Sequence, residues 1–272
     1  MTRAVVITVA PNGARRLKRD HPQIPLTIAE IGRDAALCVE AGAAMIHVHV
    51  RDGDDAHILD ADAYRDVTRE IRAQVGAAPI VQITTESVGR YAPRQQMEIV
   101  EQVRPEAVSI ALRELMPEPG AEREGSAFLH RLAGGECLVQ HILYDAGDVL
   151  RFQDLVANGA IPPSHASALF VLGRYTAGQQ SDPRDLLPFL DAWRLDLPWA
   201  TCAFGKREAA CVISAAAMGG HARVGFENNL HMPDGQMAPD NAALVRCVVA
   251  GTSAIGLRPA SPDEARQVLS KP

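Results

Sequence analysis

The chain has 272 residues, of which 47% are hydrophobic and 22% are charged, and its formal net charge is -6. This composition excludes a disordered chain, and no apolar run in the sequence is long enough to span a membrane. The negative charge and an aromatic content of only 4% exclude nucleic acid and anionic membrane surfaces as expected partners.

The five cysteines are an odd number, are scattered along the chain and form no CxxC pair. This pattern argues against a disulfide framework and against a zinc site built from thiolates. The first residues, MTRAVVITVAPNG, lack the charged region, long apolar stretch and cleavage site of a secretory signal. We therefore expect a cytoplasmic protein.

Short β-branched or apolar runs alternate with stretches of helical periodicity along the chain. The predicted strands are residues 4–9, 45–50, 79–84, 107–112, 137–143, 168–172, 199–203 and 221–226. The predicted helices are residues 27–41, 62–75, 94–103, 148–158, 184–193, 206–218 and 240–250. The first of these helices has a capping box, Thr27 with Glu30, and ends at Gly42. Residues 117–133 are expected to form a loop followed by a short helix.

This rhythm of roughly eight strand–helix units, at about thirty residues each, is typical of a (β/α)8 barrel. A doubly wound sheet has the same alternation, but it usually opens with a glycine-rich phosphate-binding turn. Here the first predicted strand is followed by PNGARR. Because no linker or repeat interrupts the pattern, we predict a single barrel domain over residues 1–272 with a C-terminal extension.

The segment GAAMIHVHVRD contains two histidines, His47 and His49, within a predicted strand. Side chains two residues apart in a strand lie on the same face, so both imidazoles can bind one divalent ion. The spacing suits zinc, whose catalytic sites use three protein ligands and leave one position open. The alternative is a pair of histidines that are hydrogen-bonded inside the barrel.

A third ligand is expected at the C-terminal end of another strand, where barrel active sites lie. Glu227 occupies that place after the last predicted strand, in the segment GGHARVGFENNL. Two histidines and a glutamate form a known catalytic zinc set. The alternative for Glu227 is a capping or solvated carboxylate in a loop.

These segments carry a resemblance to a known family that extends from the first strand to the end of the chain. The chain resembles the β-keto acid cleavage enzymes in ITVAPNGA, IPLT, GAAMIHVHVRD, GGHARVGFENNL, DGQMAPDNAALV and PASPDEARQVL. The segments HVHxRD and RVGxE are specific when they occur together.

The resemblance implies a zinc-containing (β/α)8 barrel in a homo-oligomer, usually a tetramer. It also implies a reaction between a β-keto acid and acetyl-CoA that yields acetoacetate and a new acyl-CoA. By position, the ligands of about one zinc ion per chain would be His47, His49 and Glu227. Arg223 matches the catalytic arginine of the family, and the zinc would act as a Lewis acid on the substrate.

The sequence departs from the family pattern beside the third ligand. Family members read Glu-Asp-Asn where this chain has Glu227-Asn228-Asn229, and their aspartate pairs with the arginine. Asn228 can orient Arg223 by a hydrogen bond, but a neutral amide is not a base. Either another carboxylate, Glu86 or Glu114, takes that role, or the chemistry is altered.

The expected substrate-binding residues also differ from the family pattern. Arg15 stands where a family glutamate binds an ammonium group, so we expect a neutral or anionic keto acid. The alternatives for Arg15 are a solvated position and a contact with CoA phosphates. Hydroxyl groups that would bind the substrate are expected at Thr84, Ser87 and Ser109. Arg113 and Glu114 are expected to pair with each other at the surface.

Two other functions remain open from the sequence. A metal-dependent hydrolase of the amidohydrolase type also uses His-x-His, but on the first strand and with further histidines on the fifth and sixth. Here Leu172-Gly173-Arg174 follows the sixth predicted strand without a histidine. The second is a zinc barrel with altered or lost activity, which only Asn228 favours.

Overall fold

The computed structural model describes residues 2–117 and 119–270, and its centre is a closed barrel of eight parallel strands. The barrel strands are β2 (Ile7–Val9), β3 (Met45–Val48), β6 (Ile80–Thr84), β7 (Ala107–Ala111), β8 (Leu138–Leu143), β9 (Ala166–Leu172), β10 (Trp199–Ala203) and β11 (His221–Val224). They follow one another around the barrel in chain order, and β11 closes it against β2. All eight predicted barrel strands are confirmed, and so is the predicted fold class.

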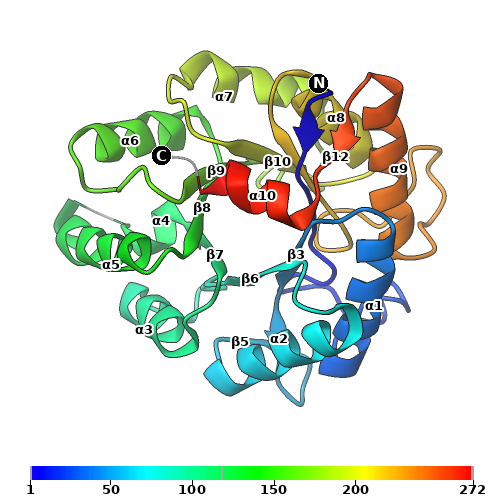
Figure 1. Ribbon diagram of the computed structural model, residues 1–272, viewed down its shortest axis with the longest axis horizontal. Coiled ribbons are helices and arrows are strands. Elements are labelled where there is room, and N and C mark those ends of the chain that lie inside the picture. The colour runs from blue at the N-terminus through cyan, green and yellow to red at the C-terminus, as the bar shows by residue number, and fades with distance from the viewer. Residues whose placement is uncertain (1, 118, 271–272) are drawn as a thin grey trace.

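A ring of helices surrounds the barrel (Figure 1). The helices are α1 (Ile28–Glu40), α2 (Ala61–Val75), α3 (Pro93–Val103), α4 (Leu112–Leu115), α5 (Glu122–Gly134), α6 (Ala146–Ala157), α7 (Leu187–Ala192), α8 (Glu208–Ala217), α9 (Asn241–Ala254) and α10 (Pro262–Leu269), with 3-10 turns η1 (Pro119–Ala121) and η2 (Pro183–Leu186). Among the described residues, no helix combines the length and the apolar character that crossing a membrane requires.

Local chemistry fixes where the helices start. The Thr27 hydroxyl accepts a hydrogen bond from Glu30 N at 3.3 Å, and the Glu30 carboxylate accepts one from Thr27 N at 3.1 Å. This reciprocal pair satisfies two of the free N–H groups at the start of α1, which confirms the predicted capping box.

In the stretch 117–133, the helix is longer than expected, because α5 begins at Glu122 directly after η1 and has 13 residues.

The end of the barrel where the strands begin is closed by the C-terminal helix. Helix α10 crosses the middle of the barrel in Figure 1. Its Ala265 and Leu269 join an apolar cluster with residues at or near the starts of the strands, Val6, Ala44, Met45, Ile80, Ala107 and Leu138. The short strands β1 (Ala4–Val5) and β12 (Arg258–Pro259) pair in parallel and tie this segment to the N-terminus. The expected C-terminal extension therefore contains a helix that the sequence reading did not predict.

The end where the strands finish carries polar groups and the longer loops. After β3, the short strands β4 (Val50–Arg51) and β5 (His57–Ile58) form an antiparallel pair. The Arg51 guanidinium donates hydrogen bonds to Ala14 O at 2.9 Å and Asp55 O at 2.8 Å, which joins this hairpin to the loop after β2. Two loops far apart in sequence are thus held together around the C-terminal ends of the strands.

Candidate metal centre and active site

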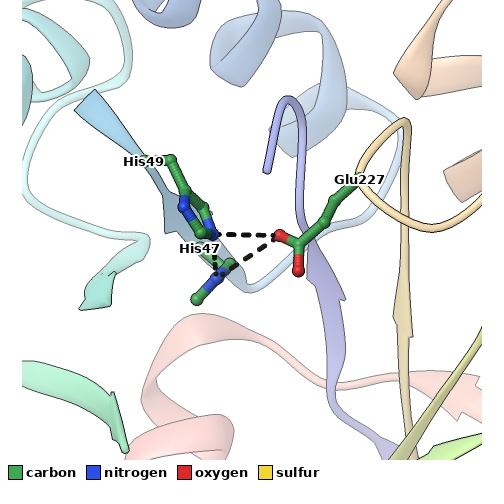
Figure 2. A group of neighbouring side chains, drawn as sticks. All are labelled: His47, His49 and Glu227. Carbon is green, nitrogen blue, oxygen red and sulfur yellow. Dashed lines mark hydrogen bonds and ion pairs between the residues drawn. The ribbon is translucent and has the colours of Figure 1, made fainter. Parts of the chain in front are cut away.

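The two histidines and Glu227 meet at the C-terminal end of the barrel (Figure 2). His47 belongs to β3, His49 follows it, and Glu227 stands in the loop after β11. His47 Nε2 lies 3.1 Å from His49 Nε2 and 3.5 Å from Glu227 Oε2, and His49 Nε2 lies 3.3 Å from the same oxygen. The three predicted ligands therefore present one atom each to a common point.

Neighbouring polar groups fix both histidines. His47 Nδ1 lies 2.8 Å from Gln82 Oε1, and Gln82 Nε2 in turn donates to Gln140 Oε1 at 3.5 Å. Because a glutamine oxygen can only accept, Nδ1 carries the proton and Nε2 is left free to bind a metal. Asn12 brackets the backbone of His49, donating to His49 O at 2.9 Å and accepting from His49 N at 3.3 Å.

The three ligand atoms fit a small divalent ion. For bonds of about 2.0–2.1 Å, a tetrahedral ion would hold its ligand atoms about 3.3–3.4 Å apart. The observed separations of 3.1, 3.3 and 3.5 Å lie around that value. Glu227 Oε2 is buried and accepts no hydrogen bond from any described residue. A buried carboxylate oxygen without a donor is costly unless a cation binds it.

The charges around the site keep the ligands in their metal-binding forms. Burial, followed by the nearby Arg223 charge, lowers the pKa of His47 well below its usual value, so the imidazole is neutral. Burial alone would raise the pKa of Glu227, but the positive charge of Arg223 beside it holds this pKa well below its usual value. Arg223 donates a hydrogen bond to Glu227 Oε1. That contact leaves Oε2 free to face the histidines.

Backbone contacts hold the loop that carries Glu227. Gly225 has φ +138°, and a side chain there would overlap the carbonyl of Ala10 on the neighbouring strand end. Gly225 N donates to the buried Glu208 Oε1 at 3.1 Å, and Phe226 N donates to Asn241 Oδ1 at 2.7 Å. The sequence did not point to Glu208 and Asn241, because only the fold brings the first turns of α8 and α9, where they stand, beside this loop.

A cavity opens beside the ligands. It is lined by His47, His49, Thr84, Glu86, Ala111, Glu114, Ile142, Tyr144, Leu169, Val171, Arg174, Cys202, Phe204, Arg223, Glu227 and Asn228. Thr84 is therefore placed as expected. Ser87 and Ser109 do not line this cavity: Ser87 Oγ accepts from Gly89 N, and the fully buried Ser109 Oγ finds no partner among the described residues.

The expected surface pair of Arg113 and Glu114 is wrong. Arg113 instead pairs with Asp145 and, at 2.8 Å, with Asp148 at the start of α6. Glu114 turns to the cavity and accepts a hydrogen bond from Ser87 N at 2.9 Å. The short helix α4, directly after β7, sends these neighbouring side chains in different directions.

Asn228 is fully buried and lines the cavity, but its side-chain nitrogen and oxygen have no hydrogen-bond partner among the described residues. The expected hydrogen bond from its side chain to Arg223 is therefore not formed. Arg223 pairs with Glu227 instead, while Arg16 donates to the backbone oxygen of Asn228 at 3.1 Å.

Arg15 lies at the mouth of the site. Its side chain is 59% exposed, and its Nη2 lies 3.7 Å from Glu86 Oε1. It lines a second cavity, together with Arg16, Glu86, Arg174 and others. Because Glu86, Arg174, Phe204 and Glu227 line both cavities, the second is an outward continuation of the first.

Comparison with known proteins identifies the family. The family model described as beta-keto acid cleavage enzyme matches residues 4–270. The chain belongs to this family. This membership contradicts the hydrolase alternative, whose histidine pair would lie on the first barrel strand, whereas here it lies on and directly after the second, β3.

Individual relatives span nearly the whole chain. A 3-keto-5-aminohexanoate cleavage enzyme of Fusobacterium nucleatum is 30% identical over 99% of this chain and 99% of its own length. A 3-oxoadipate:acetyl-CoA acetyltransferase of Cupriavidus necator is 27% identical over 100% of this chain and 96% of its own. The solved apo structure of ObcA shares the fold, with a TM-score of 0.72, 14% identity, and coverage of 91% of this chain and 65% of that chain.

Proposed function

We propose that this β-keto acid cleavage enzyme condenses a β-keto acid with acetyl-CoA and releases acetoacetate and a new acyl-CoA. The observation that carries the proposal is the set of three ligand atoms, from His47, His49 and Glu227, buried beside Arg223 in a cavity at the barrel end. The family match over residues 4–270 and the acetyl-CoA transferase names of relatives support the same reaction.

We further propose that the metal is zinc, with about one ion per chain, because two imidazoles and a carboxylate at near-tetrahedral separations suit this ion. A bound zinc supplies Lewis acidity for the keto oxygen and carboxylate of the substrate. We also propose that the enzyme works as a homotetramer in the cytoplasm.

The protein groups supply positioning, charge and proton transfer. Arg223 lines the cavity and places a buried positive charge beside the substrate, where negative charge develops as C2 loses its proton. Asn228 offers hydrogen bonds but cannot accept that proton. Glu86 and Glu114 are the cavity carboxylates left for this task. Burial raises the pKa of Glu114, which makes it a stronger base than a solvated carboxylate.

The rest of the cavity keeps water away from the reacting carbon. Apolar side chains cover its wall between the polar groups: Ala111, Ile142, Leu169, Val171 and Phe204. A water-poor pocket limits hydrolysis of the acetyl thioester and strengthens the charge interactions inside. Thr84 in the cavity and Arg15 at its mouth favour a neutral or anionic keto acid over an amino-substituted one.

The test is incubation of the purified protein with acetyl-CoA and β-keto acids whose side chains are neutral, anionic or cationic. We expect acetoacetate and a matching acyl-CoA, measured by chromatography, and no products from acetyl-CoA alone. Formation of acetoacetate by Arg223→Met should fall by about a hundredfold or more, because a buried charge beside the reacting group is lost. Absence of acetoacetate with every keto acid would contradict the proposal and favour a barrel that has lost this activity.

A further inference from the structure

The guanidinium of Arg174 lies at the junction of the two cavities and donates no hydrogen bond to any of the described residues. Arg174 follows β9 and lines both of them. Its side chain is only 19% exposed. Its ion pair within the described residues is with Glu86, with 3.9 Å between Nη2 and Oε1, which is too long for a hydrogen bond. The planar N–H donors of this group are therefore available to a ligand.

The surroundings of Arg174 hold it in place before any ligand binds. Gly173 has φ +76°, and a side chain there would overlap Ser181 Oγ and Gln180 O, so the chain must turn tightly at this point. Ser181 Oγ ties the returning loop to Leu172 O at 3.0 Å and to Phe204 O at 2.7 Å. The Arg174 guanidinium lies 5.5 Å from the centre of the Phe204 ring. Stacking uses the flat face of a guanidinium and leaves its N–H edge free.

The two carboxylates of the cavity outside the metal site already face cations or donors. Glu86 is flanked by Arg15 at 3.7 Å as well as by Arg174, and its second oxygen lies 3.9 Å from His49 Nδ1. Glu114 accepts the hydrogen bond from Ser87 N. These contacts make the two carboxylates weaker sites for an ammonium group. Arg174 shares the single charge of Glu86 with Arg15 and keeps N–H donors of the geometry that a carboxylate matches.

We propose that Arg174 binds a carboxylate at the far end of the keto acid, so that the preferred substrate is a β-keto dicarboxylic acid. The inference rests on the proposed function and names its substrate class. Arg174 and the metal ligands line the same cavity, and the Glu86 carboxylate lies 3.9 Å from both Arg174 Nη2 and His49 Nδ1, so a ligand that fills this cavity contacts both groups. The same chemistry would suit a phosphate of CoA, but the position of Arg174 beside the metal-ligand cavity favours the keto acid.

The test compares 3-oxoadipate with 3-oxohexanoate, which has a methyl group in place of the second carboxylate, and with 5-amino-3-oxohexanoate. We expect kcat/KM for 3-oxoadipate to exceed that for the other two by at least about tenfold. In Arg174→Gln, kcat/KM for 3-oxoadipate should fall about a hundredfold, while that for 3-oxohexanoate falls less than about threefold. Arg174→Lys should recover part of the loss, because it keeps the charge without the fork of donors.

The matched control is Arg184→Gln, which alters a largely exposed arginine paired with Asp182 and outside both cavities. This substitution should leave kcat/KM for all three substrates unchanged. Three results would each overturn the role of Arg174. The first is an equal loss of kcat/KM for 3-oxoadipate and 3-oxohexanoate in Arg174→Gln, and the second is a higher kcat/KM of the wild type for the amino compound. The third is a variant in which only the KM for acetyl-CoA rises. Acetoacetate from none of the three would instead overturn the proposed function, and this inference with it.

Discussion

The two ends of the barrel are built from the same eight strands but differ in what fills them. Where the strands begin, α10 covers an apolar layer that includes Met45, Ile80 and Leu138. Where the strands finish, the interior holds His47, His49 and Arg223 around a cavity. Within β3, Met45 therefore belongs to the apolar layer, and His47, two residues later, belongs to the cavity.

One end of the barrel therefore contributes mainly to the stability of the fold, and the other end carries the groups of the candidate active site. Burial of apolar surface at the closed end is favourable without further conditions. The other end, where the strands finish, is the open end. Burial of polar groups there is favourable only where each finds a partner, and Glu227 Oε2, Asn228 and Arg223 Nε lack one among the described residues. The unpaired groups at the end where the strands finish fit a bound cation and a ligand, whereas the layer under α10 is apolar.

The sharpest test of this contrast uses one buried histidine from each end. His47 lies at the metal site, whereas His221, at the start of β11, accepts a hydrogen bond from Val6 N at 3.1 Å. In His47→Ala we expect loss of the bound metal and a fall in activity of about a thousandfold or more, because a catalytic ligand is removed. In His221→Ala we expect lower thermal stability with the metal content unchanged. Metal analysis and thermal melting measure both; full metal content in His47→Ala would refute the assignment.

A buried acid near the open end should make stability depend on pH. Burial raises the pKa of Asp34 to about 7 from its usual 3.8, and Asn241 donates to it at 3.0 Å. Between pH 4 and 7 the folded state keeps a proton that the unfolded chain releases, so stability falls as the pH rises. Relative to Asp34→Asn, the wild type should lose up to about 4 kcal/mol across this range. Urea unfolding at several pH values measures the difference; a constant difference would show that Asp34 does not keep its proton.

The smallest expected effect lies at the closed end. Leu269 of α10 is 5% exposed within the apolar layer. Leu269→Ala should lower the free energy of unfolding by about 2–3 kcal/mol, because it leaves a cavity in packed surroundings. The value of kcat should not change. The exposed Met218 is the control, since Met218→Ala should shift stability by less than about 0.5 kcal/mol. A fall in kcat with Leu269→Ala would show that the two ends are coupled.

The fold could be predicted because its signals are local. Alternating apolar runs and helical periodicity located every barrel strand, and a capping box located the start of α1. The segments around His47, His49 and Glu227 predicted a metal site because strand geometry puts His47 and His49 on one face, and a barrel brings its strand ends together. The three ligand atoms lie within 4.8 Å of one another in the structure.

The remaining features depend on contacts between distant segments. Helix α10 is an exception: Ser261 and Glu264 form a capping box and Pro262 follows the N-cap, a local signal that the prediction did not use, and only its place across the barrel depends on distant contacts. Gln82 supports His47 only through the register of β3 and β6, although a polar residue in an apolar strand was a possible signal. Arg174 carried no motif; its role follows from the turn at Gly173 and the ring of Phe204.

Acetoacetate formation should depend on a metal ion held by His47, His49 and Glu227. To test this, the metal is removed with a chelator, and the rate of acetoacetate formation from acetyl-CoA and a β-keto acid is measured while zinc is added back. We expect the rate to rise with bound zinc and to level off at about one ion per chain, as a three-ligand site with one ion requires. A rate that is the same with and without metal, or a zinc-saturated site that forms no acetoacetate, would show that these ligands do not support the reaction.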